Sequence, residues 1–191
     1  QSEPEKNIKI IGDILNMNLE TQRLLVRSIQ LSDEKPFIEM ASDGSLTEIF
    51  GDCSECGKWM GDFIKEAIQL DSENNPDREY LAYAIEEKDS RTVVGSVGTS
   101  FYEDFQKIGV TYFIGAKFRG RGYAAEALRA LVEYFLTSGR VSLFMATART
   151  DNLASCKTLE KAGFHVTDTR LYQDLYDERE TLSHFYEIVK S

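Results

Sequence analysis

The hydrophobic pattern of this chain changes period at Gly122, and that change limits the folds open to it. Upstream, the segments 93–102 and 108–115 are rich in β-branched and aromatic residues and flank a polar turn, as strands of an antiparallel meander do. Downstream, the apolar residues fall on one helical face: Ala124, Ala127, Leu128, Leu131, Val132 and Phe135. A strand that runs through a glycine turn into a long amphipathic helix predicts an α/β domain.

The rest of the chain supplies further strands and helices. Strands are predicted over 24–29, 80–86, 142–148, 164–172 and 182–189, and helices from the cap residue Asp33 to Ala41, over Trp59–Leu70 and over 152–162 with Gly163 as its C-terminal stop. The stretch 43–57 reads as a long loop, and residues 1–18 form an extension before the domain of residues 19–191. The order β-α-α-β-β-β-α-β-α-β-β predicts one mixed sheet flanked by helices.

The charge and hydrophobicity of the chain limit the classes of molecule that it is expected to bind. The formal net charge of -10 and the pI of about 4.8 give a mainly negative surface, which repels nucleic acid and favours encounter with a cationic amine. No run approaches the roughly 20 apolar residues of a membrane span. We therefore expect a cytoplasmic protein with no membrane or nucleic-acid partner.

The cysteines predict neither a disulfide framework nor a metal centre. Cys53 and Cys56 form a C-x-x-C pair, Cys156 stands alone, and the odd count indicates a reducing compartment. Only His165 and His184 are available to join them, at no familiar metal spacing. We expect no metal.

The strongest chemical signal is the turn Lys117–Ala124, which links the predicted strand to the long helix. The first amides of a helix have no intrahelical acceptor and carry partial positive charge, so an anion fits there. Gly120 and Gly122 allow close backbone approach, and three cations, at 117, 119 and 121, reverse the local charge. The alternative is a plain turn with a solvated basic face. The G-K-[ST] and G-x-G-x-x-G nucleotide patterns are both absent.

The segment 119–124, Arg-Gly-Arg-Gly-Tyr-Ala, resembles the R-x-x-G-x-A signature of the GNAT N-acetyltransferase superfamily. Residues 151–164 resemble its second cofactor motif, especially in the branch that acetylates ribosomal-protein N-termini, and residues 24–27 resemble the first strand of that branch. The resemblance spans about residues 19–189. It implies a mostly antiparallel twisted sheet and transfer of an acetyl group from acetyl-CoA to a primary amine, with a protein or peptide N-terminus as the first candidate.

The resemblance also implies the cofactor site. The strand before the signature splays from its neighbour and offers backbone to the pantetheine arm, while the turn and helix start hold the diphosphate. The residues implied are Tyr112, Phe113, Ile114, Arg119, Gly120, Arg121, Gly122, Tyr123, Ala124, Ala125, Asn152 and Ser155. Asn152 also stands where the N-cap of the following helix belongs, and from the sequence alone capping is the favoured role.

The catalytic groups depart from the family pattern. Leu159 stands where many members have a tyrosine that protonates the coenzyme A thiolate, so Ser155 or a water is the predicted acid. Gly109 stands where some members have a glutamate base. The remaining base candidates, acting through water, are Glu103, Asp104 and His184, although turn carboxylates are usually only solvated.

Two other functions stay open at this point: a non-catalytic acyl-CoA-binding module, and an acetyltransferase for an amino sugar, antibiotic or polyamine. A scaffold that uses the acidic surface is a third reading. Acceptor specificity is expected from the loop 43–57, the helix after it and the hairpin 172–180. The residues of that hairpin suited to receive an ammonium group are Tyr172, Asp174, Tyr176, Asp177 and Glu178. A homodimer is an open expectation.

Overall fold

The computed structural model describes residues 16–174 and 178–190. Most of the predicted N-terminal extension, and the acceptor candidates Tyr176 and Asp177, lie outside these residues. The first strand, β1 (Asn18–Glu20), pairs with β2 (Leu24–Ser28), so the sheet takes in the last residue of the predicted extension.

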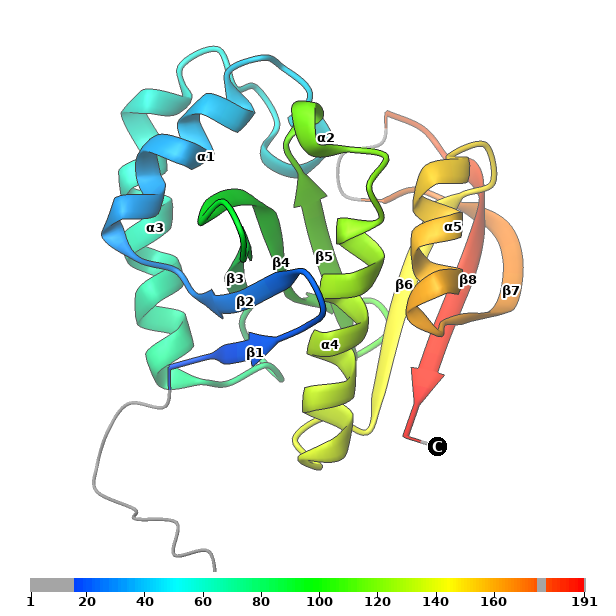
Figure 1. Cartoon of the computed structure of the whole chain (residues 1–191). Helices are drawn as coiled ribbons and strands as arrows, with labels where there is room; N and C mark the ends of the chain where they lie inside the picture. The colour runs from blue at the N-terminus through cyan, green and yellow to red at the C-terminus, as the bar shows by residue number, and fades with distance from the viewer. Residues whose placement is uncertain (1–15, 175–177, 191) are drawn as a thin grey trace, which may run out of the picture.

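One twisted sheet of eight strands forms the centre of the molecule (Figure 1), in the order β1-β2-β3-β4-β5-β6-β8-β7. The other strands are β3 (Leu81–Glu87), β4 (Thr92–Tyr102), β5 (Lys107–Ile114), β6 (Leu143–Arg149), β7 (His165–Tyr172) and β8 (Thr181–Val189). Strands β3, β4 and β5 form the predicted antiparallel meander. The pair β5 and β6 is parallel, so the predicted mixed, mostly antiparallel sheet is confirmed.

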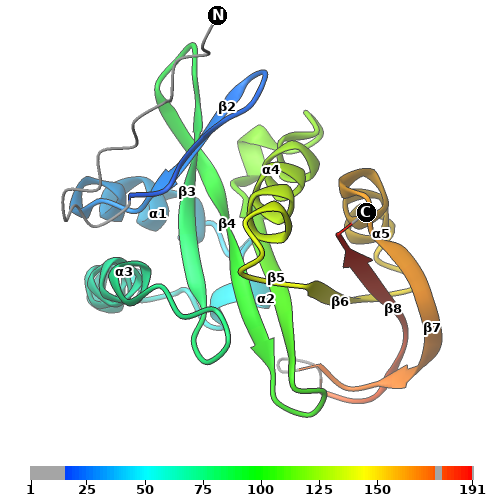
Figure 2. The ribbon, with the colours of Figure 1, turned by 90° about the horizontal axis from the view of Figure 1, so that it is seen from below.

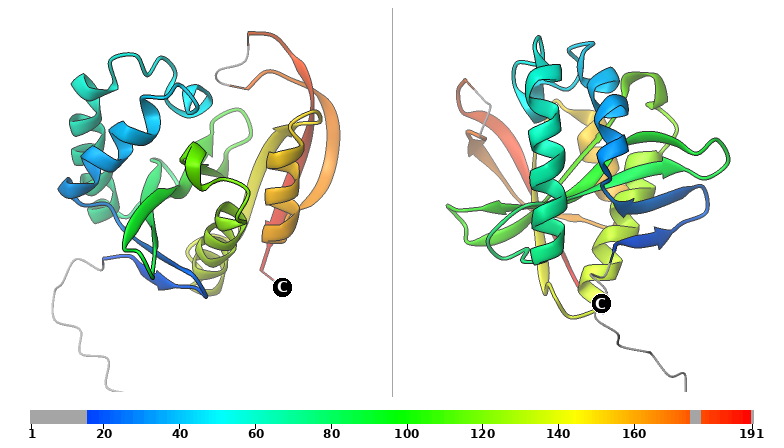
Figure 3. Two further views of the ribbon diagram at one scale, coloured as in Figure 1. Left: turned by 45° about the horizontal axis from the view of Figure 1, so that its top comes forward. Right: turned by 90° about the vertical axis from the view of Figure 1, so that its left-hand side faces the viewer.

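Helices cover both faces of the sheet (Figures 2 and 3). On one side lie α1 (Glu34–Ala41) and α3 (Cys56–Glu73), with the short α2 (Thr47–Phe50) between them in sequence. On the other side lie α4 (Tyr123–Thr137) and α5 (Leu153–Ala162). The two short 3-10 turns are Leu31–Asp33 and Ala116–Phe118.

Each layer of helices buries its own apolar core. The core under α4 and α5 includes Leu128, Leu131 and Phe135, all fully buried on the helical face that the sequence predicts. The core under α1 and α3 is built on Phe37, Met60 and Ile64. Successive residues of β5 point to opposite cores, because side chains alternate along a strand.

Strands β5 and β6 separate soon after they meet. Gly109 and Met145 are their single pair of register partners, whereas β5 pairs with β4 along its whole length, from Lys107 to Ile114. The C-terminal part of β5 therefore has an edge that β6 does not cover. This is the splay that the family resemblance implies, and it lies next to the start of α4 (Figure 1).

Two local predictions were wrong. Asp33 occupies the N-cap position of α1, but its side chain makes no capping bond to that helix and instead accepts the Gln30 N–H, at 2.8 Å, in the capping box of the preceding 3-10 turn. Its carboxylate is 2% exposed and accepts two bonds from Arg27, at 2.8 and 2.9 Å, because a buried charge needs a full partner. The predicted loop 43–57 contains the helix α2. None of the four residues of α2 is buried, so the sequence has no hydrophobic periodicity there that would predict a helix.

Candidate active site

The turn before α4 presents a row of backbone donors. Gly120 and Gly122 have positive φ angles of 77° and 79°, which L residues adopt only with strain, and they turn the chain into the helix. The first helical bond runs from the Glu126 N–H to the Gly122 carbonyl, at 3.2 Å. Across residues 16–174 and 178–190, no acceptor is found for the N–H groups from Gly120 to Ala125. These donors meet the predicted requirement for an anion site.

The space in front of this turn is open. A Cβ atom built on Gly120 would meet no atom within 4 Å, and one on Gly122 would meet only an Arg23 nitrogen, at 3.6 Å. A ligand can therefore approach the turn on the side where side chains would stand at Gly120 and Gly122.

The three cations of the turn have protein partners of their own. Arg119 donates from Nε to the Ile114 carbonyl and from a terminal nitrogen to the Ser45 carbonyl, each at 3.0 Å. Arg121 lies 3.8 Å from the Glu87 carboxylate, and the Lys117 ammonium lies 5.0 Å from the centre of the Phe118 ring. Arg119 thus ties the loop after α1 to the end of β5. Backbone amides are the main donors left for an anion.

Residues far away in sequence fix the shape of the turn. Arg23 donates to the Arg121 carbonyl at 2.8 Å and binds the Glu126 carboxylate from Nε, at 2.8 Å. Burial acts to raise the pKa of Glu126, but hydrogen bonds from Thr21 and Arg23 outweigh it and hold the pKa below its ordinary value. The Tyr123 hydroxyl donates to Glu87 from β3. The start of α4 is therefore pre-organised by β3 and by the turn between β1 and β2.

The splay contains a direct contact between two hydroxyl groups. The Tyr112 hydroxyl of β5 lies 2.8 Å from Ser155 Oγ, in the first turn of α5. Asn152 accepts from the Ser155 N–H at 3.1 Å, so the capping role weighed for this asparagine is present. Burial raises the pKa of Tyr112, and the hydrogen bond with Ser155 lowers it in part. The predicted acid thus has a phenol as its immediate neighbour.

Leu159, at the position of the missing tyrosine, is 1% exposed and packs in the core under α5. It has no acid chemistry to offer. The family resemblance implies a role only for the backbone of Tyr112, and no local pattern indicates a role for its side chain, because the contact with Ser155 joins residues 43 apart.

The predicted base candidates lie in different places. Glu103 and Asp104 are exposed in the turn between β4 and β5, at the opposite end of β5 from the turn Lys117–Ala124, the predicted phosphate turn. His184 lies on β8 opposite Ala148, and its Nδ1 is 2.7 Å from Thr169 Oγ1. Among the described residues, none of the three forms a hydrogen bond with Tyr112 or Ser155.

A second hydrogen-bonded chain lies where the sheet opens. A Cβ atom on Gly109 would overlap the Tyr102 ring, so this ring fills the space of the missing glutamate. The Tyr102 hydroxyl lies 3.1 Å from Thr147 Oγ1 and accepts from the Thr147 N–H at 3.2 Å. The Thr147 hydroxyl in turn donates to an Asp174 carboxylate oxygen, at 2.7 Å. The carboxylate of Asp174, a residue of the predicted acceptor hairpin, thus reaches Thr147 of β6. Thr147 lies two residues beyond Met145, the β6 residue that pairs with β5.

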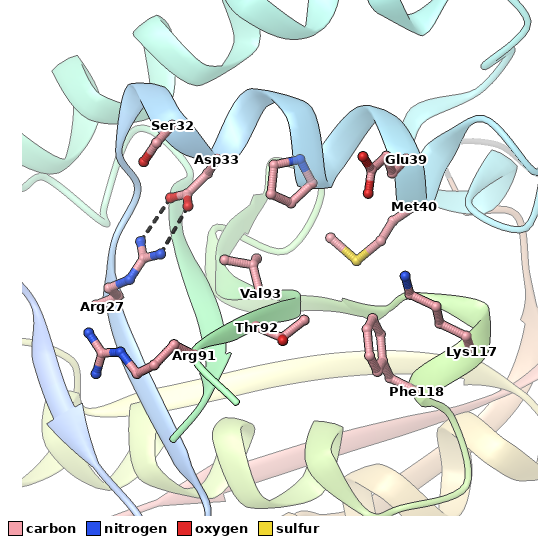
Figure 4. Close-up of a pocket in the computed structure, with 11 residues that line it drawn as sticks. Arg27, Ser32, Asp33, Glu39, Met40, Arg91, Thr92, Val93, Lys117 and Phe118 are labelled. Atoms are coloured by element: carbon pink, nitrogen blue, oxygen red, sulfur yellow. Dashed lines mark hydrogen bonds and ion pairs between the residues drawn. The ribbon is translucent and has the colours of Figure 1, made fainter. Parts of the chain in front are cut away.

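A separate pocket of about 320 Å³ lies between α1 and the start of β4 (Figure 4). Its walls include the ion pair of Arg27 and Asp33, together with Met40, Lys117 and Phe118. It adjoins the phosphate turn through the last two residues, but neither Tyr112 nor Ser155 lines it. We therefore do not identify it with the transfer centre.

Within residues 16–174 and 178–190 there is no cluster of three or more histidine, cysteine, aspartate or glutamate side chains suited to a metal ion. The three cysteines are buried free thiols. A search of the same residues for a helix long and apolar enough to cross a bilayer finds none.

The sequence matches the Acetyltransferase (GNAT) domain family over residues 23–165. The chain belongs to this family. This GNAT protein is 32% identical over 155 residues to the uncharacterized N-acetyltransferase YjdG of Bacillus subtilis (strain 168). The match covers 76% of the present chain and 88% of YjdG. The family membership makes it an acyl-CoA-dependent N-acyltransferase.

Solved structures share the fold of this GNAT domain. RimL, the ribosomal L7/L12 alpha-N-protein acetyltransferase in complex with coenzyme A, superposes with a TM-score of 0.74 at 14% identity, covering 91% of this chain and 97% of that one. The Microcin C7 self immunity acetyltransferase MccE, in complex with acetyl-CoA and AMP, gives a TM-score of 0.73 at 16% identity, covering 89% and 94%. These likenesses support the predicted GNAT fold.

Proposed function

We propose that this GNAT enzyme transfers an acetyl group from acetyl-CoA to a primary amine, by direct attack of the amine on the thioester. The observation that carries the proposal is the row of acceptor-free amides from Gly120 to Ala125 beside the uncovered edge of β5. A hydrogen bond to a charged group contributes about 1.5–3 kcal/mol, so a few such amides suffice to hold a diphosphate.

The pantetheine arm then lies along β5. Tyr112, Phe113 and Ile114 follow Gly109, the last residue of β5 with a register partner on β6. An extended amide-bearing ligand pairs with such an edge as an added strand does. This direction leads from the turn at Gly120 to the hydroxyls of Tyr112 and Ser155, where the thioester sulfur is expected.

The carboxylate of Asp174 is the group that we propose binds the acceptor amine and accepts its proton. An ammonium group must lose a proton before it attacks a thioester, and a carboxylate binds the cation and accepts that proton. The Thr147 hydroxyl donates to the Asp174 oxygen at 2.7 Å, and the Tyr102 hydroxyl contacts Thr147 Oγ1 at 3.1 Å. Glu103, Asp104 and His184 remain weaker candidates for the base, because no comparable hydrogen-bonded chain joins them to the splay within residues 16–174 and 178–190.

The acceptor we favour is the N-terminal amine of a protein or peptide. The name of RimL, whose fold this chain shares, describes alpha-N-protein acetylation. The net charge of -10 attracts a cationic chain end. The acceptor site we infer lies beside α2 and β6, which the 3.9 Å ion pair of Glu48 and Arg149 joins.

The experiment is calorimetry with coenzyme A, followed by thiol release from acetyl-CoA in the presence of peptide and small-molecule amines. We expect micromolar binding and release that depends on a peptide amine. Binding without acceptor-dependent release identifies an acyl-CoA-binding module instead, and release with amino sugars or polyamines alone identifies a small-molecule enzyme. No heat at millimolar coenzyme A refutes the proposal.

A further inference from the structure

We propose that the phenol of Tyr112 is the acid that protonates the coenzyme A thiolate, with Ser155 holding it in place. This inference rests on the acetyl transfer proposed above. It assigns to a side chain of β5 the role that many family members give to a tyrosine at the position of Leu159.

The first argument is the place of the hydroxyl. Tyr112 lies on β5 beyond Gly109, the residue whose register partner on β6 is Met145. Its ring packs against the core under α4 and α5, and its hydroxyl reaches Ser155 Oγ at 2.8 Å. The bond therefore crosses the opening of the sheet, on the side of the sheet that carries α4, whose first amides form the phosphate turn.

The second argument is chemical. A phenol with an ordinary pKa near 10 is protonated at neutral pH, whereas a serine hydroxyl is far too weak an acid to release its proton unaided. Burial raises the pKa of Tyr112 and keeps the phenol neutral. Of the two hydroxyls in contact, the phenol is the better proton donor.

The step balances without another reactant. The amine nitrogen bonds to the thioester carbon, the C–S bond breaks, and its electron pair goes to sulfur. The Tyr112 O–H proton then moves to sulfur, which gives the free thiol. The phenolate accepts a hydrogen bond from Ser155 Oγ–H and regains a proton from water, while the base carries off the proton of the amine.

The central variant is Tyr112→Phe, with Tyr134→Phe as the matched control, because Tyr134 lies on α4 and its hydroxyl accepts a long, 3.4 Å hydrogen bond from Arg140. We expect kcat to fall about 10- to 100-fold in Tyr112→Phe, at the low end of general-acid effects because a thiolate leaves fairly well unaided. The KM for acetyl-CoA and the Kd for coenzyme A should change less than about threefold. The control should keep the wild-type kcat.

A fluorinated tyrosine introduced at position 112 keeps the shape of the ring and makes the phenol more acidic. If Tyr112 is the acid, the alkaline limb of the kcat profile moves to lower pH, which a purely structural role does not produce. The other titratable groups beside this phenol are the Cys156 thiol of α5 and the Tyr186 phenol of β8. The variants Cys156→Ala and Tyr186→Phe should leave the limb in place.

The outcomes separate the two proposals. A wild-type enzyme that transfers acetyl groups, with Tyr112→Phe within twofold of its kcat or a limb that fluorination does not move, overturns this inference alone. A wild-type protein that binds coenzyme A but acetylates no amine overturns the proposed function and this inference with it. If Tyr112→Phe fails to fold, the fluorinated protein alone decides.

Discussion

Gly120→Ala separates the anion site from the stability of the turn that forms it. Gly120 has φ at 77°, and its added Cβ would meet no atom within 4 Å, so the folded state loses no packing. The left-handed backbone costs an alanine about 1–2 kcal/mol. At about 2–4 °C per kcal/mol for a domain of this size, the Tm should fall by about 2–8 °C.

Gly139→Ala is the matched control. Gly139 has φ at 73°, also has open space around its Cβ position, and lies beyond the far end of α4. It should lower the Tm by a similar amount. Only at Gly120 does the methyl group stand in front of the free amides.

The loss of one charge-assisted bond, about 1.5–3 kcal/mol, corresponds to a roughly 10- to 100-fold higher Kd for coenzyme A. Calorimetry on both variants, below their melting temperatures, measures this difference. Equal affinities for coenzyme A in Gly120→Ala and Gly139→Ala, at equal Tm, would refute the assignment of the diphosphate to this turn.

Three further predictions concern other groups. Asp174→Asn should lower kcat about 100-fold or more with little change in the Kd for coenzyme A, as steady-state rates and calorimetry will show; an unchanged kcat removes Asp174 as the base. Asn152→Ala should lower the free energy of unfolding by about 1 kcal/mol, whereas Asn152→Asp keeps the capping oxygen and the wild-type Tm. Weaker coenzyme A binding in both variants would show that the Asn152 amide group contacts the cofactor. Glu126 has a lowered pKa in the folded state, so its stabilising effect is complete above its unfolded pKa and disappears as pH falls through the folded value. The Tm difference between wild type and Glu126→Gln should therefore shrink from about pH 6 to pH 3, and a constant difference would contradict the linkage.

The parts of the fold that the sequence predicts are those with a strong local signal. The helix α4 begins after Gly122 and packs its predicted face in the core, because an amphipathic period over four turns has one compact solution. Gly163 follows α5 with φ at 103°, as expected of a helix stop. The short α2 and the three-residue β1 have too few residues to show a period.

The site is less predictable, because its contacts join distant segments. Tyr112 and Ser155 are 43 residues apart, and Tyr102 and Thr147 are 45 apart. No spacing rule brings such pairs together; the strand register and the path of the chain through α4 do. Gly109 illustrates the difference, since in sequence it appears only as a missing glutamate, whereas in the structure the Tyr102 ring leaves no room for a side chain.

Strand β5 explains how one segment serves two reactants. Its side chains alternate, so Tyr112 and Ile114 belong with the core under α4 and α5, and Phe113 with the core under α1 and α3. The first face carries the proposed acid, and the second packs against α2, where the ring centroids of Phe113 and Phe50 are 5.3 Å apart, on the side of the proposed acceptor site. A shift of one residue in register would exchange Tyr112 for Phe113 and move the phenol away from Ser155. The eight-residue pairing of β5 with β4 prevents that shift. In the proposed reaction, the meander thus holds the cofactor chemistry and the acceptor chemistry on opposite faces of one strand.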